Sequence, residues 1–130
     1  MLFPSWPNPQ KQIINLGLER IKELLARLNN PQHFLPPIVH IAGTNGKGST
    51  LAFIKSILQN SGYKVHSYTS PHLVEFNERI ELANKMINDD FLNEVSLECK
   101  NASLKDPTLE LSFFEGTTAM AFLAFSKVKA

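Results

Sequence analysis

The sequence predicts an α/β fold: a parallel sheet, incomplete in this chain, with flanking helices. Two apolar runs, 38–42 and 64–68, have the length and composition of buried strands. Between them lie a glycine-rich turn and a helical pattern whose apolar stripe includes Leu51 and Leu58. The stretch 38–68 has about the length of one βαβ unit, so we expect parallel strands joined by a right-handed crossover.

The N-terminal part predicts an irregular arm followed by an amphipathic helix. Residues 1–12 contain three prolines, each of which removes a backbone donor and fixes φ. The turn Asn29-Asn30-Pro31 is expected to end the helix that follows the arm. The apolar residues that define this helix recur at spacings of three and four and are Ile14, Leu18, Ile21, Leu25 and Leu28.

Beyond residue 68 the pattern predicts a loop, a hairpin and two helices. Gly62, just after the central helix, suits a helix end that needs positive φ. The other expected elements are a hairpin of Arg79–Ala83 with Lys85–Ile87 across Asn84, a helix over 90–101 capped by Asp89 or Asp90, a loop at Ser103–Thr108 and a helix over 113–126.

The composition excludes several classes of protein. The 130 residues carry 13 Lys and Arg against 12 Asp and Glu, a net charge of +1, which argues against a nucleic-acid-binding stripe. With 43% hydrophobic residues the chain is in the globular range, yet no apolar run reaches the roughly 18 residues of a membrane span. The N-terminus lacks a signal-peptide pattern, and the single Cys99 cannot form an internal disulfide. We therefore expect a cytoplasmic protein without nucleic-acid or membrane partners.

The glycine-rich turn has the composition of a phosphate-binding loop. It reads Gly43-Thr44-Asn45-Gly46-Lys47-Gly48-Ser49-Thr50 and stands between a strand pattern and a helix. Glycines let backbone N–H groups face an anion, the helix start favours negative charge, Lys47 adds a positive charge, and Ser49 or Thr50 offers a hydroxyl to Mg²⁺. The spacing departs from the usual P-loop pattern, since Ile41 occupies the place of its first glycine and Gly48 follows the lysine. An ordinary helix-capping glycine turn, with Lys47 in solvent, is the alternative.

Four segments together resemble one family. The string from His40 to Thr50 is similar to the ATP-binding loop of the Mur ligase superfamily, and the other three resemble motifs of its folylpolyglutamate synthase / dihydrofolate synthase branch. These three are L-G-L-E-R at 16–20, T-S-P-H-L at 69–73 with F-N-E-R-I at 76–80, and F-E-G-T-T at 114–118. The four occur in family order and span nearly the whole chain, which makes them specific as a set.

The resemblance implies the N-terminal part of a P-loop-type ATP-binding domain in a carboxylate–amine ligase. Such an enzyme adds L-glutamate to folate or dihydropteroate through an acyl phosphate and uses ATP and Mg²⁺. It further implies that Thr44 to Lys47 hold the triphosphate and that Ser70 and Glu115 help hold Mg²⁺. The residues implied for the pteridine side of the folate site are Asn15, Leu16 and Gly17. Many relatives have Asp where this chain has Asn15.

Several of these residues also suit a structural role. Glu115 stands three residues after Ser112, the spacing of a capping box, in which its carboxylate would bind the cap N–H. Ser70 precedes Pro71, a common turn pair, and His72 in the same loop is expected to face solvent. A carboxylate committed to a backbone N–H offers less to a metal, so the two interpretations of Glu115 compete.

Two other functions compete with this interpretation, and the chain is expected to be incomplete. One alternative is another Mur-type amide ligase, and the other is a non-catalytic nucleotide-binding remnant. Family members are longer and have a second, C-terminal domain that is absent here, and no catalytic residue can be located. Two parallel strands and an uncertain hairpin would leave an apolar sheet edge unpaired. We therefore expect a fragment that is weakly stable and without turnover on its own.

Overall fold

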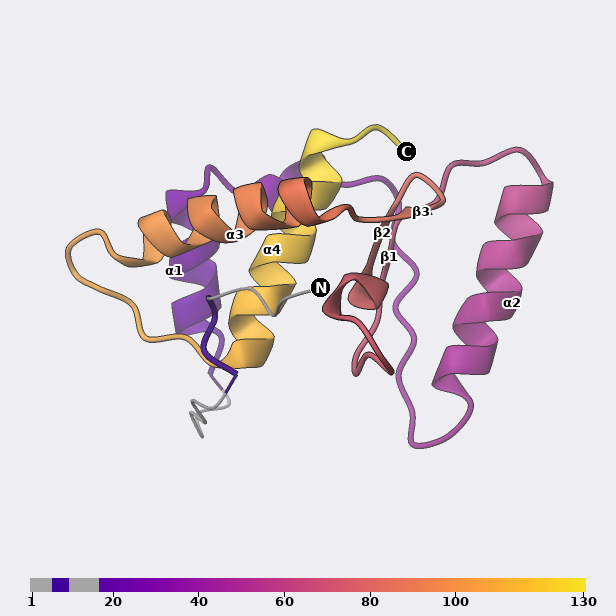
Figure 1. Cartoon of the computed structure of the whole chain (residues 1–130), viewed down its shortest axis with the longest axis horizontal. Helices are drawn as coiled ribbons and strands as arrows, with labels where there is room; N and C mark the ends of the chain where they lie inside the picture. Colours follow the sequence, from indigo (N-terminus) through magenta and orange to yellow (C-terminus); the bar gives the residue numbers. More distant parts are fainter. Residues whose placement is uncertain (1–5, 10–16) are drawn as a thin grey trace.

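Four α-helices and a small sheet make up most of the structure, a computed structural model that describes residues 6–9 and 17–130. The elements are, in order, α1 (Glu19–Arg27), η1 (Pro31–Phe34), α2 (Lys47–Asn60), β1 (Ser67–Tyr68), η2 (Phe76–Arg79), β2 (Ile80–Leu82), β3 (Lys85–Met86), α3 (Asp89–Ser103) and α4 (Phe113–Lys127). Helices α1, α3 and α4 pack together on one side of the sheet, and α2 stands alone on the other (Figure 1).

The hydrophobic core lies between α1, α3 and α4. Helix α4 is apolar on nearly every side, and its buried alanines 119, 121 and 124 let neighbouring elements approach closely. Burying one leucine contributes about 1.5–3 kcal/mol, so this three-helix core carries much of the hydrophobic stabilisation. The buried apolar residues from the other two helices are Leu24 and Leu25 of α1 and Leu92, Val95, Cys99 and Ala102 of α3.

The sheet has three short antiparallel strands in the order β1-β2-β3. Tyr68 of β1 faces Ile80 of β2, and Leu82 of β2 faces Lys85 of β3. Strands β2 and β3 are joined by Ala83 and Asn84, whose φ values of 49° and 73° are those of a two-residue hairpin turn. The predicted hairpin across Asn84 is thereby confirmed.

The predicted parallel strand pair is not formed. Residues 38–42 belong to no strand, and Ile38 and Val39 are 68% and 62% exposed. The predicted strand 64–68 is reduced to the two residues of β1, which pairs antiparallel with β2. A parallel strand needs a neighbouring strand to bond its backbone N–H and C=O groups. In the described part of the chain the sheet contains only β1, β2 and β3, and none of them pairs with residues 38–42. The apolar run at 38–42 therefore stays at the surface.

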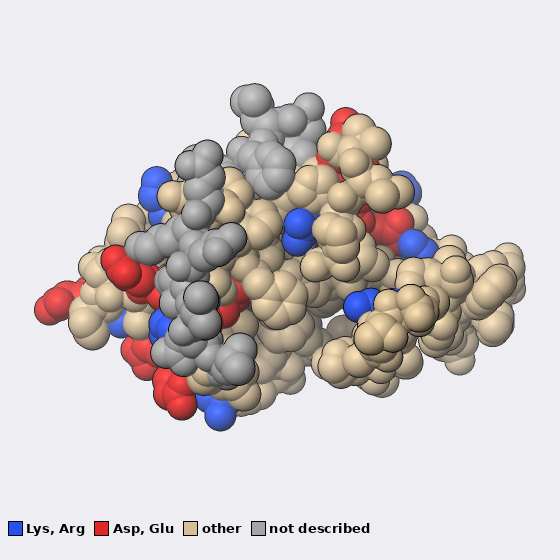
Figure 2. Space-filling model, turned by 90° about the horizontal axis from the view of Figure 1, so that it is seen from below, with Lys and Arg blue, Asp and Glu red and all other residues tan. Residues whose placement is uncertain are grey.

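Helix α2 is confirmed but buries none of its residues. Phe53 and Ile57 are 69% and 65% exposed, and an ion pair from Lys55 to Glu81 links the helix to β2. In Figure 2 the right-hand lobe, where α2 lies, is almost uncharged, whereas acidic and basic side chains mix over the rest of that face. Gly62 follows the helix with a φ of 93°, as predicted.

The N-cap of α3 is Asn88, and the prediction of Asp89 or Asp90 is wrong. The Asn88 Oδ1 accepts a hydrogen bond from the backbone N–H of Phe91 at 2.8 Å. Both aspartates lie in the first turn, where a negative charge interacts favourably with the helix dipole. Asn and Asp are equally good N-caps, so composition alone does not choose among three consecutive candidates.

Arg27, in the last turn of α1, binds the C-terminal end of α3 and the loop that follows it. Its Nη1 donates to the carbonyl oxygens of Ala102 and Lys105 at 3.1 and 3.0 Å, and its Nη2 donates to that of Pro107 at 2.6 Å. A guanidinium satisfies several carbonyls at once because its N–H groups form a rigid fork. The loop that follows α3, predicted at Ser103–Thr108, is therefore tied to α1.

Residues 6–9, the described part of the predicted arm, contain no helix or strand and lie against α3 and α4. The Trp6 carbonyl accepts a hydrogen bond from Ser96 Oγ at 2.8 Å. Pro7 is fully buried over Gly116, where a Cβ atom would lie 2.7 Å from the proline ring. No helix in the described ranges is long and apolar enough to cross a bilayer.

Candidate nucleotide and metal site

The predicted phosphate loop, residues 43–50, is open to solvent along its whole length. Gly46 is the N-cap of α2 and has a φ of 75°, a conformation that glycine adopts without strain. Lys47 is the first residue of the helix, and the Thr50 N–H donates to the Gly46 carbonyl at 2.9 Å. The loop and the helix start therefore have the local arrangement that the sequence predicts.

The first turn of α2 has no side-chain cap, unlike those of α3 and α4. Helix α3 is capped by Asn88, and α4 by a reciprocal capping box of Ser112 and Glu115. Within the described residues, the N-cap of α2 makes no side-chain hydrogen bond, and the first turn of this helix has no acidic residue. Uncapped N–H groups at a helix start are donors for an anion, and the helix dipole adds to the attraction.

The loop that contains Ser70 is joined to α4 through the end of β1. The Tyr68 hydroxyl lies 2.9 Å from the Thr117 hydroxyl oxygen and 3.3 Å from that of Thr118. Thr69 then donates its backbone N–H to the Arg79 carbonyl at 2.8 Å. Ser70, the next residue, is exposed. Ser70 lies two residues after Tyr68, and Glu115 lies two residues before Thr117. Because Tyr68 contacts Thr117, the segments that contain Ser70 and Glu115 meet at the start of α4.

Glu78 and Arg79 build this loop, a role that the motif alone does not reveal. The Glu78 carboxylate accepts the backbone N–H groups of Leu73 and Val74 at 3.1 and 2.9 Å, and that of Glu75 at 2.7 Å. Hydrogen bonds from these three backbone N–H groups, led by that of Glu75, lower the pKa of Glu78. The carboxylate therefore stabilises the turn while it is ionised.

Arg79 is a buried cation enclosed by rings. Its guanidinium lies 5.4 Å from the ring centre of Phe76 and 5.2 Å from that of Phe113. Its Nε donates to His72 Nδ1 at 2.8 Å, so that this ring nitrogen is an acceptor. The prediction of a solvent-facing His72 is wrong, because the ring is half-buried and also packs edge-on against Phe76. An arginine between two aromatic rings could have been suspected from the F-N-E-R-I and F-F-E strings, although their contact depends on the tertiary fold.

Glu115 has the capping role that competed with metal binding. Its Oε1 accepts the Ser112 backbone N–H at 3.0 Å, and its own N–H donates to Ser112 Oγ at 3.1 Å. The same Oε1 also accepts from Arg20 Nε at 3.2 Å and Arg20 Nη2 at 2.9 Å. Oε2 accepts no hydrogen bond from the residues that the structure describes.

The surroundings of Glu115 keep it ionised. Burial acts to raise the pKa of this carboxyl, but hydrogen bonds from the Ser112 backbone and from Arg20 outweigh it, and the net shift is downward. Oxygen ligands of this kind are those that Mg²⁺ prefers, and Mg²⁺ is usually held by only one or two carboxylates with phosphate and water oxygens. The residues fit such an ion, although no cluster of three or more His, Cys, Asp or Glu side chains occurs in the described parts of the chain.

The residues predicted for the folate site are only partly described. Gly17 is half-buried just before α1, whereas Asn15 and Leu16 lie outside the described residues.

In Figure 1 α2 and α4 stand on opposite sides of the sheet, and both have their N-terminal ends toward the lower edge of the view. The N-terminal ends of α2 and α4 thus point toward the same edge of the molecule, with the sheet between the two helices.

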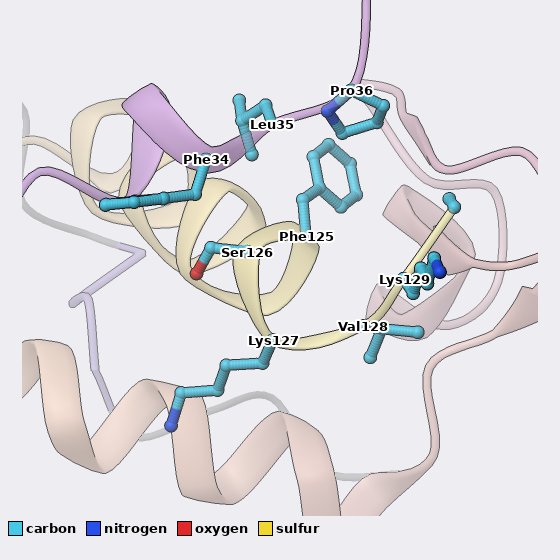
Figure 3. A pocket seen from close by; sticks show the side chains of 9 residues that line it. Phe34, Leu35, Pro36, Phe125, Ser126, Lys127, Val128 and Lys129 are labelled. Carbon is cyan, nitrogen blue, oxygen red and sulfur yellow. The ribbon is translucent and has the colours of Figure 1, made fainter.

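One hollow in the surface is lined by other residues than these. It has a volume of about 440 Å³ and is lined by residues 34–36, after η1, and by 125–130, at the end of α4. Figure 3 shows the Phe125 ring below Leu35 and Pro36, while Lys127 points away. The ring of His66 stacks on Phe125 with 4.9 Å between ring centres. None of the predicted site residues lines this hollow.

Known proteins share both the sequence and the fold of this chain. No family model matches it. It is 43% identical over 114 residues to the dihydrofolate synthase/folylpolyglutamate synthase of Bacillus subtilis, which covers 85% of this chain and 26% of that protein. The structure of E. coli FolC in complex with DHPP and ADP matches with a TM-score of 0.81 and 36% identity, over 92% of this chain and 28% of FolC.

A further structure, a bifunctional folylpolyglutamate synthase/dihydrofolate synthase with Mn, AMPPNP and L-glutamate bound, matches with a TM-score of 0.82 and 30% identity. It covers 93% of this chain and 29% of that one. Over the matched region the chain has the α/β fold of FolC-type proteins. Over the length that it spans, the chain belongs to the folylpolyglutamate synthase / dihydrofolate synthase family. It spans about a quarter of the length of the curated relatives that it matches.

Proposed function

We propose that this chain is the N-terminal part of the ATP-binding domain of a ligase that adds L-glutamate to folate or dihydropteroate. The observation that carries the proposal is the uncapped first turn of α2, preceded by the exposed loop 43–50 and opened by Lys47. In this proposal residues 38–68 are the phosphate-binding unit of a P-loop-type domain. The two solved structures described above contain ADP or AMPPNP, which supports a nucleotide as the anion.

The loop residues bind the phosphates of ATP in this proposal. Backbone N–H groups of Gly43 to Ser49 surround the oxygens, and the Lys47 ammonium neutralises part of their charge. At about 4 Å a unit charge pair is worth roughly 4 kcal/mol at an effective dielectric near 20, and solvent at this exposed site reduces that value.

Ser70 and Glu115 hold the divalent cation in this proposal. The Ser70 hydroxyl and the Glu115 Oε2 supply two oxygen ligands from segments that Tyr68 joins. The cation, once bound, neutralises negative charge as the phosphoryl group is transferred. The manganese ion in a related structure supports a divalent ion at such a site in the family.

The proposed reaction joins a carboxylate to an amine at the expense of ATP. A substrate carboxylate oxygen takes the γ-phosphoryl group, and ADP leaves. The glutamate nitrogen then forms a bond to the activated carbonyl carbon, phosphate leaves, and the nitrogen loses its protons to solvent or base. A carboxylate is a poor electrophile, and the phosphoryl group supplies the leaving group that it lacks. Residues 15–17 are assigned to the pteridine side of the substrate, as the resemblance implies.

The nucleotide assignment can be tested on the chain itself. We would titrate a fluorescent ADP analogue with Mn²⁺ into the chain and into Lys47→Ala, with Lys64→Ala as a control that removes an exposed lysine outside the loop. We expect Lys47→Ala to weaken binding about tenfold or more, about 1.4 kcal/mol, and the control to bind normally. Equal binding by all three proteins would refute the loop assignment.

A further inference from the structure

Arg20 and Glu115, 95 residues apart in sequence, form an ion pair between the start of α1 and the start of α4. Both are largely shielded from water, with side-chain exposures of 20% and 12%. The pair joins two of the four family-like segments, since Arg20 ends L-G-L-E-R and Glu115 belongs to F-E-G-T-T. Nothing in the sequence pattern relates these two residues, because their contact depends on the packing of α1 against α4.

The geometry of this pair is unusual for arginine and a carboxylate. In the common fork arrangement, two N–H groups of the guanidinium bind the two different oxygens. Here Nε and Nη2 both donate to Oε1, at 3.2 and 2.9 Å. The Ser112 backbone N–H donates to the same atom at 3.0 Å. Three donors thus converge on one oxygen, which fixes the carboxylate while Oε2 accepts nothing from the described residues.

We propose that Arg20 is a positioning residue that holds Glu115 through Oε1 and leaves Oε2 available to the divalent cation of the nucleotide. This inference rests on the proposed function. It resolves the competition between capping and metal binding, since each role uses a different oxygen of one carboxylate. A rotation about the terminal bond of Glu115 would exchange the two oxygens, and the three donors on Oε1 oppose that rotation.

The proposal differs from a purely electrostatic view of the pair. If Arg20 only neutralises Glu115, its removal frees the carboxylate and should tighten cation binding, and a lysine should substitute for it. If Arg20 positions Glu115, a lysine keeps the charge but loses the paired donors Nε and Nη2. Arg20→Lys and Arg20→Gln should then both weaken cation binding, in spite of their different charges.

The first test needs no cation and measures the pair in the free chain. The unfolding equilibrium in urea would be measured for Arg20→Gln, Glu115→Gln and the double variant, with Lys22→Gln on the exposed face of α1 as a control. We expect the two single changes to be coupled by fivefold or more in the unfolding constant, and Lys22→Gln to change it less than twofold. Additive single changes would overturn the proposal.

The second test measures Mn²⁺ binding in the presence of ADP. We expect Arg20→Lys and Arg20→Gln each to raise the Mn²⁺ dissociation constant at least fivefold, and Lys22→Gln to leave it unchanged. Binding by Arg20→Lys equal to that of the unchanged chain, or tighter binding by Arg20→Gln, would overturn the positioning role while the proposed function stands. Absence of Mn²⁺–ADP binding to the unchanged chain would overturn the proposed function, and this inference with it.

Discussion

The close contact between Gly116 and the N-terminal arm gives the sharpest prediction for stability. A Cβ atom at Gly116 would lie 2.7 Å from both Cβ and Cγ of Pro7 and 3.2 Å from the Trp6 ring. Ordinary contacts begin near 3.4 Å, so the proline ring must retreat by about 0.7 Å. The ring is rigid and fully buried, and the preceding carbonyl is held by Ser96. Gly116→Ala should therefore displace the arm from α4.

Two opposing terms set the size of the effect. Overpacking a well-packed site costs about 1–3 kcal/mol. Alanine in place of glycine stabilises a helix by up to about 1 kcal/mol. We expect Gly116→Ala to lower the free energy of unfolding by about 1–2 kcal/mol, or less if the arm detaches and the helices keep their packing. In that second case the loss is limited to the contacts made by residues 6–9.

The single tryptophan of the chain reports on this contact directly. Trp6 fluorescence and far-ultraviolet circular dichroism would be followed together during urea unfolding. We expect Gly116→Ala to shift Trp6 emission to longer wavelength in the native state and to increase its quenching by iodide. Gly48→Ala is a matched control, since Gly48 also lies in the first turn of a helix and has nothing within 4 Å of a built Cβ.

The refuting result is clear for this pair of variants. The control should keep native Trp6 emission and gain a few tenths of a kcal/mol from helix propensity. If Gly116→Ala behaves in the same way, with unchanged emission and equal or higher stability, the packing of Pro7 over Gly116 is wrong. The Trp6 environment would then have to be explained by other contacts.

Three further results follow from single side chains. The pKa of Glu78 is lowered from 4.5 in the folded chain, so the ionised carboxylate stabilises the fold above about pH 4.5, and this stabilisation is lost as the pH falls through the lowered pKa. Glu78→Gln should therefore reduce the loss of stability on acidification, measured as the urea midpoint between pH 6 and 3. An unchanged pH dependence would contradict this. Burial raises the pKa of Cys99 to about 12, with a smaller contribution from Glu98 and an opposing one from Lys127. The Cys99 thiol should therefore react with Ellman's reagent at pH 8 at least about a hundredfold more slowly in the native chain than in the chain unfolded in urea. Arg27→Met should lower the free energy of unfolding by about 2–4 kcal/mol and speed amide hydrogen exchange in the loop after α3. A decrease in the free energy of unfolding below about 1 kcal/mol would show that the three hydrogen bonds to carbonyls contribute little.

The sequence was most informative where structure is local. The helical periodicity predicted α3, α4 and the end of α1 to within a few residues, because each buries one continuous apolar stripe or surface; Ile14, where the first helical repeat was expected to begin, lies outside the described residues. The turn at Asn84 and the capping box at Ser112 are encoded within a few residues and were also predicted. The predicted parallel strand pair is not formed, because an apolar run becomes a strand only when another strand pairs with it, and that depends on the rest of the sheet.

The candidate site shows the same division. The composition of the loop at 43–50 predicted an exposed glycine turn at a helix start, and that local geometry is present. The partnership of Arg20 with Glu115 and the contact of Arg79 with Phe113 were not predictable. Each joins residues that are far apart in the chain, and sequence spacing carries no information about such contacts.

The distribution of these long-range contacts bears on how the proposed site is assembled. Three of the four family-like segments meet at the start of α4: Arg20 binds Glu115, and Tyr68, just before T-S-P-H-L, binds Thr117. The phosphate loop takes no part in that cluster, and its helix is tied to the sheet by the ion pair of Lys55 with Glu81. The proposed cation ligands are thus fixed by the core, whereas the proposed phosphate ligands sit on a helix that buries none of its residues. Changes that loosen α2 should therefore weaken nucleotide binding before they affect the Arg20–Glu115 pair.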